Sequence, residues 1–150
     1  MKTKIQVIAY ILIAFVFFNS CDSFKDDEYD DYKEVPKNID GVWRIKTVSR
    51  NGIDITKMMD FSEFRLNLNQ DGSYSIDNYL PFAVKEDGQW RVDDPEYPFN
   101  LIMREKNSGE DVSIRLKYPI LEGRRIMSVS VSPGCYSNTY QYVFEKVETN

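Results

Sequence analysis

The chain of 150 residues contains no histidine, and this sets the first limit on its chemistry. Histidine is the usual general base, the usual partner of serine and cysteine nucleophiles and the commonest metal ligand. A dense group of acids, Asp93, Asp94 and Glu96, lies in one segment that also holds two prolines. Paired carboxylates can hydrolyse glycosides and loop oxygens suit calcium, so both chemistries stay open there. Adjacent acids on a turn are usually solvated, and we predict a protein that is not an enzyme and holds no cofactor or metal.

The first cysteine, Cys21, follows a pattern typical of secretion. Lys2 and Lys4 precede an apolar run over residues 7–18, and small polar residues end at Ser20. The run is shorter than the ~20 residues that cross a bilayer, and it fits the apolar region of a signal peptide. A cysteine at this place resembles the lipid-attachment site of bacterial lipoproteins. We therefore predict a signal peptide over residues 1–20 and a lipidated Cys21, with ordinary cleavage as the alternative.

Lipidation of Cys21 would leave Cys135 as the remaining thiol. The chain could then form no disulfide within itself and no zinc site built from several cysteines. Cys135 lies in the turn-forming segment 133–137, which favours a small, partly buried turn residue. Pairing with a second molecule is the alternative.

The net charge of the chain is −5, and removal of residues 1–20 lowers it to −7 because this leader contains two lysines and no acid. Residues 22–40 hold eight acids, three lysines and Pro36, a composition that predicts a disordered tether. Residues 41–150 carry only −2 and show neither the basic excess of a nucleic-acid binder nor a polybasic membrane patch. The predicted organisation is thus a signal peptide (1–20), a lipidated tether (21–40) and one folded domain (41–150).

Lys25, Asp26, Asp27 and Glu28 follow the cysteine closely. This stretch resembles the short export signal of surface-exposed lipoproteins in Bacteroidota. The resemblance implies a protein anchored in the outer membrane through its N-terminal lipid and displayed on the cell surface. The alternative is a solvated spacer that carries no export signal.

Alternation of apolar and polar residues predicts eight strands after residue 40. A period of two means that one face of each strand is buried and the other meets water, as in an antiparallel sheet. The eight segments are 43–45, 64–68, 74–76, 90–92, 99–101, 112–118, 127–131 and 140–144.

Short connections join the predicted strands. Six of them carry glycine, which accepts the positive φ of tight hairpins, and the segment 93–98 carries prolines instead. Consecutive strands with short links predict an up-and-down barrel, which leaves no exposed sheet edge. One short helix is expected over residues 55–61, across one end of the barrel. The predicted fold is all-β, an eight-stranded antiparallel barrel with one short helix.

Gly41 and Trp43 open the first predicted strand and resemble the Gly-x-Trp signature of lipocalins, whose tryptophan closes the base of the barrel. Lipocalins place an arginine of the last strand over that ring, and here Lys146 stands in its place. The whole pattern over residues 39–147 is similar to lipocalin-like lipoproteins of Bacteroidota, a group largely without known function. The resemblance implies the barrel and the envelope location, and it implies no particular ligand.

Aromatic residues are spread over seven of the eight predicted strands. A barrel of this size is either filled by side chains or holds one small ligand. In the second case, aromatic rings near an open end suit a hydrophobic or carbohydrate ligand. The alternative function is an interaction subunit that docks on another envelope protein, and no nucleic acid is expected in either case. The candidate ligand-binding residues are Tyr79, Phe82, Trp90, Tyr97 and Tyr136.

Overall fold

The structure is a computed structural model that describes residues 33–80, 82–134 and 137–148. The lipidation site at Cys21, the export signal over residues 25–28 and Tyr136 lie outside these ranges. The chain divides into two compact units, Met1–Glu34 and Val35–Asn150, and the strands belong to the second.

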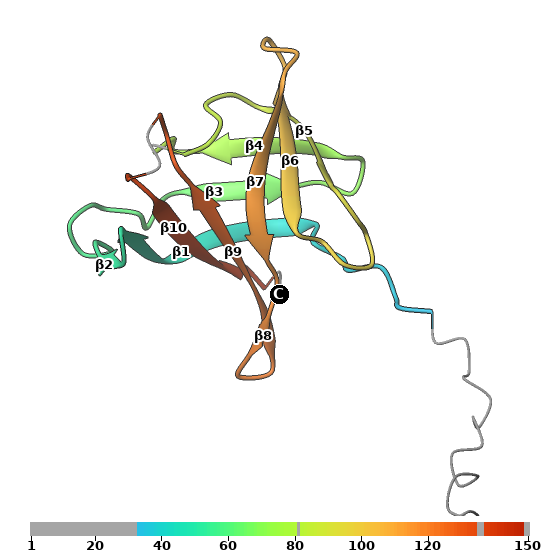
Figure 1. Ribbon diagram of the computed structural model, residues 1–150, viewed down its shortest axis with the longest axis horizontal. Coiled ribbons are helices and arrows are strands. Elements are labelled where there is room, and N and C mark those ends of the chain that lie inside the picture. The colour runs from blue at the N-terminus through green and yellow to red at the C-terminus, as the bar shows by residue number, and fades with distance from the viewer. Residues whose placement is uncertain (1–32, 81, 135–136, 149–150) are drawn as a thin grey trace, which may run out of the picture. The chain divides into compact units, whose positions relative to one another are not determined.

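Every regular element in the described ranges is a β-strand, and each pairs antiparallel with its neighbours (Figure 1). The strands alternate buried and exposed side chains, as in Asp111–Lys117, because one face of each strand lines the interior of the sheet. The elements are β1 (Gly41–Arg50), β2 (Ile53–Asp54), β3 (Arg65–Leu68), β4 (Ser73–Asp77), β5 (Gly88–Val92), β6 (Asn100–Glu105), β7 (Asp111–Lys117), β8 (Ile120–Leu121), β9 (Arg124–Val131) and β10 (Tyr140–Lys146).

Eight of these strands form a closed barrel. Neighbours pair in the order β1-β3-β4-β5-β6-β7-β9-β10, and β10 pairs with β1 as well as with β9, which closes the ring. Figure 1 shows β3 and β4 crossing behind β6 and β7, as opposite walls of a barrel do. The short strands β2 and β8 are small hairpin extensions of β1 and β9. The predicted eight-stranded antiparallel barrel is confirmed.

The predicted helix over residues 55–61 is wrong, since this segment forms successive turns. The carboxylate of Asp54 accepts a hydrogen bond from the Thr56 backbone N–H at 2.8 Å, and Asp60 accepts one from the Ser62 N–H at 3.0 Å. Short polar side chains that bond to nearby backbone offer the chain an alternative to helix. Over the described residues, we find no helix with the length and apolar character needed to span a bilayer.

The interior of the barrel is filled by apolar side chains. Eighteen hydrophobic residues are buried in one cluster, and large members such as Trp43, Leu101 and Phe144 are 0% exposed. The connection between β4 and β5 turns inward, so that Phe82 and Val84 join the core. Phe82 packs edge-on against Tyr142 with ring centroids 5.4 Å apart. Of the two alternatives, the structure has the packed barrel.

Residues before Gly41 pack onto one end of the barrel, although the sequence assigned them to the tether. Ile39 is 2% exposed, and its carbonyl accepts a hydrogen bond from Trp43 Nε1 at 2.9 Å. The Lys37 N–H donates to the carbonyl of Pro95 at 2.7 Å. We call this the Trp43 end; it also holds Tyr118, whose ring meets Trp43 edge-on at 6.1 Å.

Candidate functional site

The sequence-predicted ligand residues that lie in the described ranges, Tyr79, Phe82, Trp90 and Tyr97, are distributed over several parts of the barrel. Phe82 is 9% exposed and belongs to the core, where its ring makes tilted and edge-on contacts with other aromatic rings. Tyr79 is exposed in the connection between β4 and β5, whereas Tyr97 is exposed in the connection between β5 and β6 at the Trp43 end. Among the candidates in the described ranges, Trp90 lines a surface hollow.

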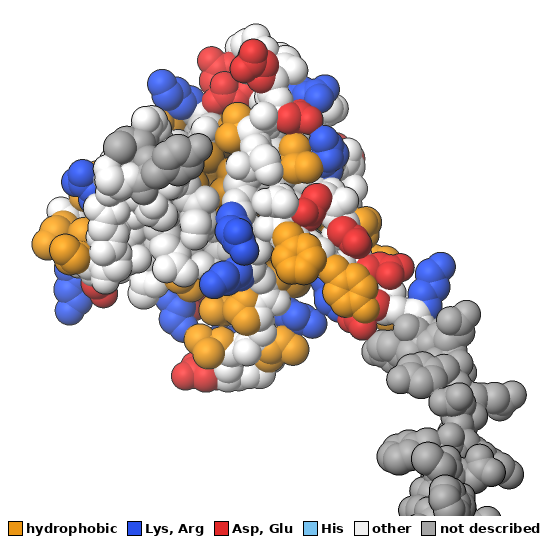
Figure 2. Space-filling view, in the orientation of Figure 1, with side chains coloured by type: hydrophobic (Ala, Val, Ile, Leu, Met, Phe, Trp, Pro, Cys, Tyr) orange, Lys and Arg blue, Asp and Glu red, His pale blue; other side chains and the backbone are white. Residues whose placement is uncertain are grey.

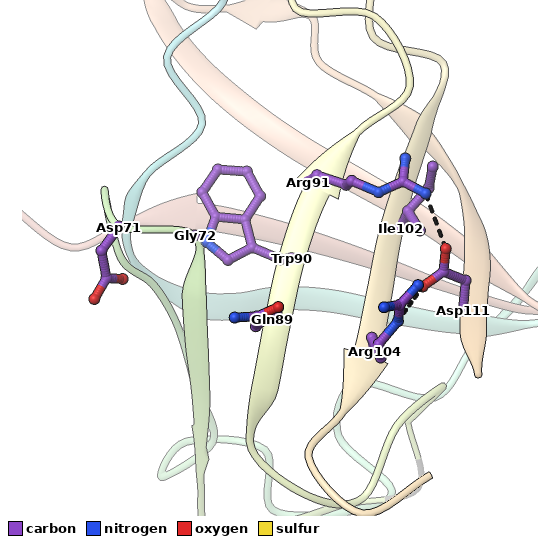
Figure 3. Close-up of a pocket in the computed structure, with 8 residues that line it drawn as sticks. All are labelled: Asp71, Gly72, Gln89, Trp90, Arg91, Ile102, Arg104 and Asp111. Atoms are coloured by element: carbon purple, nitrogen blue, oxygen red, sulfur yellow. Dashed lines mark hydrogen bonds and ion pairs between the residues drawn. The ribbon is translucent and has the colours of Figure 1, made fainter. Parts of the chain in front are cut away.

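Trp90 forms one wall of a groove on the outside of the barrel (Figure 3). The hollow has a volume of about 290 Å³ and lies between the turn that joins β3 to β4 and the outer face of β5, β6 and β7. Its lining joins one aromatic side chain to an amide, two guanidinium groups and two carboxylates. The lining residues are Asp71, Gly72, Gln89, Trp90, Arg91, Ile102, Arg104 and Asp111.

Two backbone carbonyls fix Trp90 in this position. The Trp90 N–H donates to the Gly72 carbonyl at 2.7 Å, and the indole Nε1–H donates to the Asn69 carbonyl at 3.0 Å. The turn that supplies both carbonyls is itself closed by Asp71, whose carboxylate accepts hydrogen bonds from the Ser73 N–H at 2.9 Å and from its hydroxyl. These bonds hold the pKa of Asp71 below its ordinary value. The orientation of the indole ring is therefore fixed, and the ring also packs against the core cluster.

The opposite wall is a network of three charged side chains (Figure 3). Asp111 accepts a hydrogen bond from Arg104 Nε at 2.7 Å and one from Arg91 Nη2 at 2.9 Å. The bond from Arg104 is the main reason that the pKa of Asp111 is lowered, and the bond from Arg91 adds to it. One carboxylate between two guanidinium groups keeps both arginines in place while their remaining N–H donors stay available to a ligand.

A second hollow of about 490 Å³ continues the groove along β5 and β6, because Gln89 and Arg104 line both. Tyr74 lines this second hollow from the barrel interior and is 2% exposed. Within the described residues, its hydroxyl is buried and has no hydrogen-bond partner. Burial, and then the nearby charges of Glu105 and Asp87, raise the Tyr74 pKa, so the group stays a neutral donor. A buried hydroxyl without a partner is costly.

Close approach of β5 to β6 shapes this part of the groove and depends on Gly88. A Cβ atom at residue 88 would lie 1.9 Å from the backbone carbonyl oxygen of Arg104. No other residue fits without movement of the strands. The pairing of β4 with β5 is short, because only Ser73 and Tyr74 pair with Gln89 and Gly88. Few backbone hydrogen bonds therefore close the barrel wall beside Tyr74.

The acidic segment after β5 is a structural turn. Asp93 accepts hydrogen bonds from the backbone N–H groups of Asn100 at 2.9 Å and Phe99 at 3.0 Å. These bonds lower the Asp93 pKa to about 2. Asp94 accepts from the backbone N–H groups of Glu96 and Tyr97 in the same way. Across the described parts of the chain, no group of three or more acids or cysteines has a geometry that could hold a metal ion.

The sequence pointed to Trp90 and missed its polar neighbours. Gln89 and Arg91 alternate along β5, and Ile102 and Arg104 alternate along β6, so they share the outer face of the wall. Alternation alone predicts that these side chains face outward, but it does not predict which outward-facing side chains become neighbours. The turn at Asp71 comes to lie beside these residues only when the barrel folds.

Comparison with known proteins gives a family. Neither the curated proteins nor the solved structures contain a match to the chain. A family model described as a domain of unknown function, DUF5004, matches residues 21–145. The match covers most of the chain and includes every strand of the barrel except Lys146, the last residue of β10. The chain therefore belongs to the DUF5004 family of domains.

Proposed function

We propose that the protein is a carbohydrate-binding module anchored to the cell envelope by lipid, and that the groove beside Trp90 takes a neutral sugar unit. One observation carries the proposal: Tyr74, whose buried hydroxyl has no partner in the described chain, lines a hollow that continues the Trp90 groove. A ligand hydroxyl that reached Tyr74 would satisfy this group. Sugars carry several hydroxyls, which can pair with the amide, guanidinium and carboxylate groups that line the groove.

The lining of the groove favours a neutral ligand over an ion. Two arginines, Arg91 and Arg104, are balanced by Asp71 and Asp111. Amide, guanidinium and carboxylate side chains are planar groups that form paired hydrogen bonds, and here Asp111 holds the guanidinium groups of Arg91 and Arg104. The barrel interior is filled, which disfavours a hydrophobic ligand enclosed within it. The outer wall is thus the better place for a ligand.

The envelope location is supported by the N-terminal pattern. The family match begins at residue 21, the cysteine that follows the leader. The resemblance to lipocalin-like lipoproteins of Bacteroidota favours display on the outer membrane. Cys21→Ala should remove the lipid, which is measured as loss of acyl mass and loss of partitioning into a detergent phase. Unchanged partitioning would refute the anchor.

Sugar binding can be tested with neutral gluco-, xylo- and manno-oligosaccharides by calorimetry on the full chain. Tyr74→Phe removes the unpartnered hydroxyl, so we expect this variant to unfold at a higher denaturant concentration and yet to bind about tenfold more weakly. Gln89→Ala changes an exposed side chain of the groove and should weaken binding with no change in stability. Tyr79→Ala, an exposed tyrosine outside the groove, is the control. Equal affinity of all four proteins, or no binding at all, would refute the proposal.

An interaction subunit is the second candidate, and one observation favours it. Ile53 in β2 and the adjacent pair Met58 and Met59 between β2 and β3 are exposed, with exposed fractions of 66%, 74% and 46%. Methionine-rich exposed surfaces adapt to protein partners. Crosslinking through Met58→Cys in intact cells would capture such a partner, whereas recovery of the uncrosslinked protein alone would count against it.

A further inference from the structure

The hairpin formed by β8 and β9 projects past the barrel wall at the Trp43 end (Figure 1). Its two-residue turn, Glu122 and Gly123, has φ of 52° and 76°, which matches the twist of a tight hairpin. The side chains of Ile120 and Leu121 on its first strand are 59% and 49% exposed. Apolar side chains at the tip of a projecting hairpin are a surface that a partner or a membrane would cover.

The root of the hairpin is fixed to the barrel. Arg125 Cζ lies 5.3 Å from the centroid of the Tyr118 ring, and Arg125 Nη1 donates to the Tyr118 carbonyl at 3.0 Å. The Tyr118 hydroxyl in turn donates to the carbonyl of Asn38 at 2.8 Å. The hairpin is therefore held next to the segment through which the chain enters the barrel.

Basic side chains line a cleft between the hairpin and the outer face of β1 and β10. The cleft has a volume of about 1080 Å³. Figure 2 shows hydrophobic and basic side chains together over the hairpin. Three acids also line the cleft, and one of them, Glu145, is paired with Arg44 at 2.8 Å. The five cations, separated in sequence but gathered by the fold, are Arg44, Lys46, Arg124, Arg125 and Lys146.

Other exposed apolar residues lie at the same end. The described part of the chain has ten large hydrophobic side chains that are exposed, and six of them are at the Trp43 end. These six are Val35, Val42, Tyr97, Phe99, Ile120 and Leu121. Tyrosine and phenylalanine side chains favour the boundary between water and lipid.

We propose that the β8–β9 hairpin contacts anionic phospholipid headgroups, with Ile120 and Leu121 in the boundary layer and its basic cleft over the phosphates. The proposal rests on the lipid anchor at Cys21 proposed above. Thirteen residues lie between Cys21 and Val35, and a link of this length spans at most about 50 Å when it is fully extended. Such a link raises the effective concentration of the hairpin at the bilayer to the millimolar range.

Tryptophan fluorescence tests the contact in the full chain. Ile120→Trp places a reporter on the hairpin, and Ile53→Trp, a similarly exposed isoleucine in the other two-residue hairpin strand, is the matched control. Each lipidated protein is reconstituted into phosphatidylglycerol vesicles with brominated acyl chains, and the wild-type signal of Trp43 and Trp90 is subtracted. We expect at least threefold stronger quenching at residue 120 than at residue 53. Equal quenching at both positions would overturn the proposal.

The charge requirement needs a second pair of variants. Lys46→Gln with Arg124→Gln removes two cations of the cleft and leaves Arg125 on Tyr118, whereas Lys57→Gln with Lys106→Gln removes two exposed cations elsewhere. We expect the first pair to lower the quenching at residue 120 severalfold and the second to leave it unchanged. Replacing phosphatidylglycerol by phosphatidylcholine in the vesicles should also lower the quenching at residue 120 severalfold. Undiminished quenching in phosphatidylcholine would overturn the headgroup contact.

Failure of the anchor is distinguished by mass spectrometry. A protein without acyl mass would refute lipidation at Cys21, and the same vesicles then report on the hairpin alone through flotation. Preferential quenching at residue 120 in the floated fraction would support the contact. An unlipidated protein that does not float with phosphatidylglycerol vesicles would overturn it.

Discussion

Lys146 Nζ lies 5.9 Å from the centroid of the Trp43 ring, and the two residues are paired across β1 and β10. A cation over an indole face at this distance is attracted by the ring quadrupole. Gly41 makes the arrangement possible, since a Cβ atom there would lie 2.3 Å from Lys146 Cε. The Gly-x-Trp pattern at the start of β1 thus has a physical reason: the glycine leaves room for the lysine that covers the tryptophan.

Gly41→Ala should destabilise the barrel. Its φ of +128° is one that residues with a side chain rarely adopt, and the added methyl group would displace Lys146. We expect a loss of roughly 1–3 kcal/mol in the free energy of unfolding, measured with denaturant. Gly109→Ala is the control, because its φ is +69° but no atom lies within 4 Å of the new Cβ. Lys146→Ala should rescue part of the loss at residue 41, and a lack of any rescue would mean that only the backbone matters.

Trp43→Ala should cost about 3–5 kcal/mol, because it removes a buried aromatic ring and leaves a cavity. The side chain is 0% exposed and contacts the Tyr118 ring as well as the Ile39 carbonyl. Trp43→Phe should cost less, since most of the apolar volume remains and the hydrogen bond to Ile39 is lost. A shift below about 1 kcal/mol for Trp43→Ala would contradict a closing role for this ring.

The strands could be predicted because their signal is local. Leu66 and Leu68 on β3, or Ile114 and Leu116 on β7, alternate with polar residues and are buried as the alternation requires. Phe82 is different, because it stands outside any strand and is buried by contacts with Phe64 and Tyr142. Its placement depends on residues distant in sequence, and no local period indicates it.

The groove and the basic cleft escaped sequence analysis for the same reason. Asp71 and Asp111 line one hollow although three strands, β4, β5 and β6, lie between them in the chain. Arg44 and Arg124 line one cleft because β1 and β9 flank β10. A count of charges along residues 41–150 gives nearly zero net charge and conceals both arrangements. Closure of the barrel decides which charges become neighbours.

Stability should fall in acid partly through Asp93. Backbone N–H groups of Asn100 and Phe99 favour its charged form and lower its pKa to about 2, below its ordinary 3.8. A lowered folded-state pKa stabilises the fold above pH 3.8, and this contribution is lost as the pH falls through about 2. Asp93→Asn should therefore be less stable at pH 7 and should lose less stability between pH 4 and pH 2 than the wild type does. If the free energy of unfolding changed with pH in the same way for the two proteins, this role of Asp93 would be contradicted.

The last prediction concerns residues 25–28, outside the described ranges, where the pattern Lys25-Asp26-Asp27-Glu28 resembles an export signal. Replacement of all four by alanine should leave lipidation and the stability of the barrel unchanged, because the compact unit of the barrel begins at Val35. We expect only the location to change: a protease added to intact cells should cleave the wild-type protein and spare the variant. Asp30→Ala with Asp31→Ala removes acids outside the pattern and should stay accessible. Equal cleavage of all three proteins would mean that these acids are only a solvated spacer. Protection of all three would place the barrel inside the envelope. There, a protein partner would fit the barrel better than an external sugar.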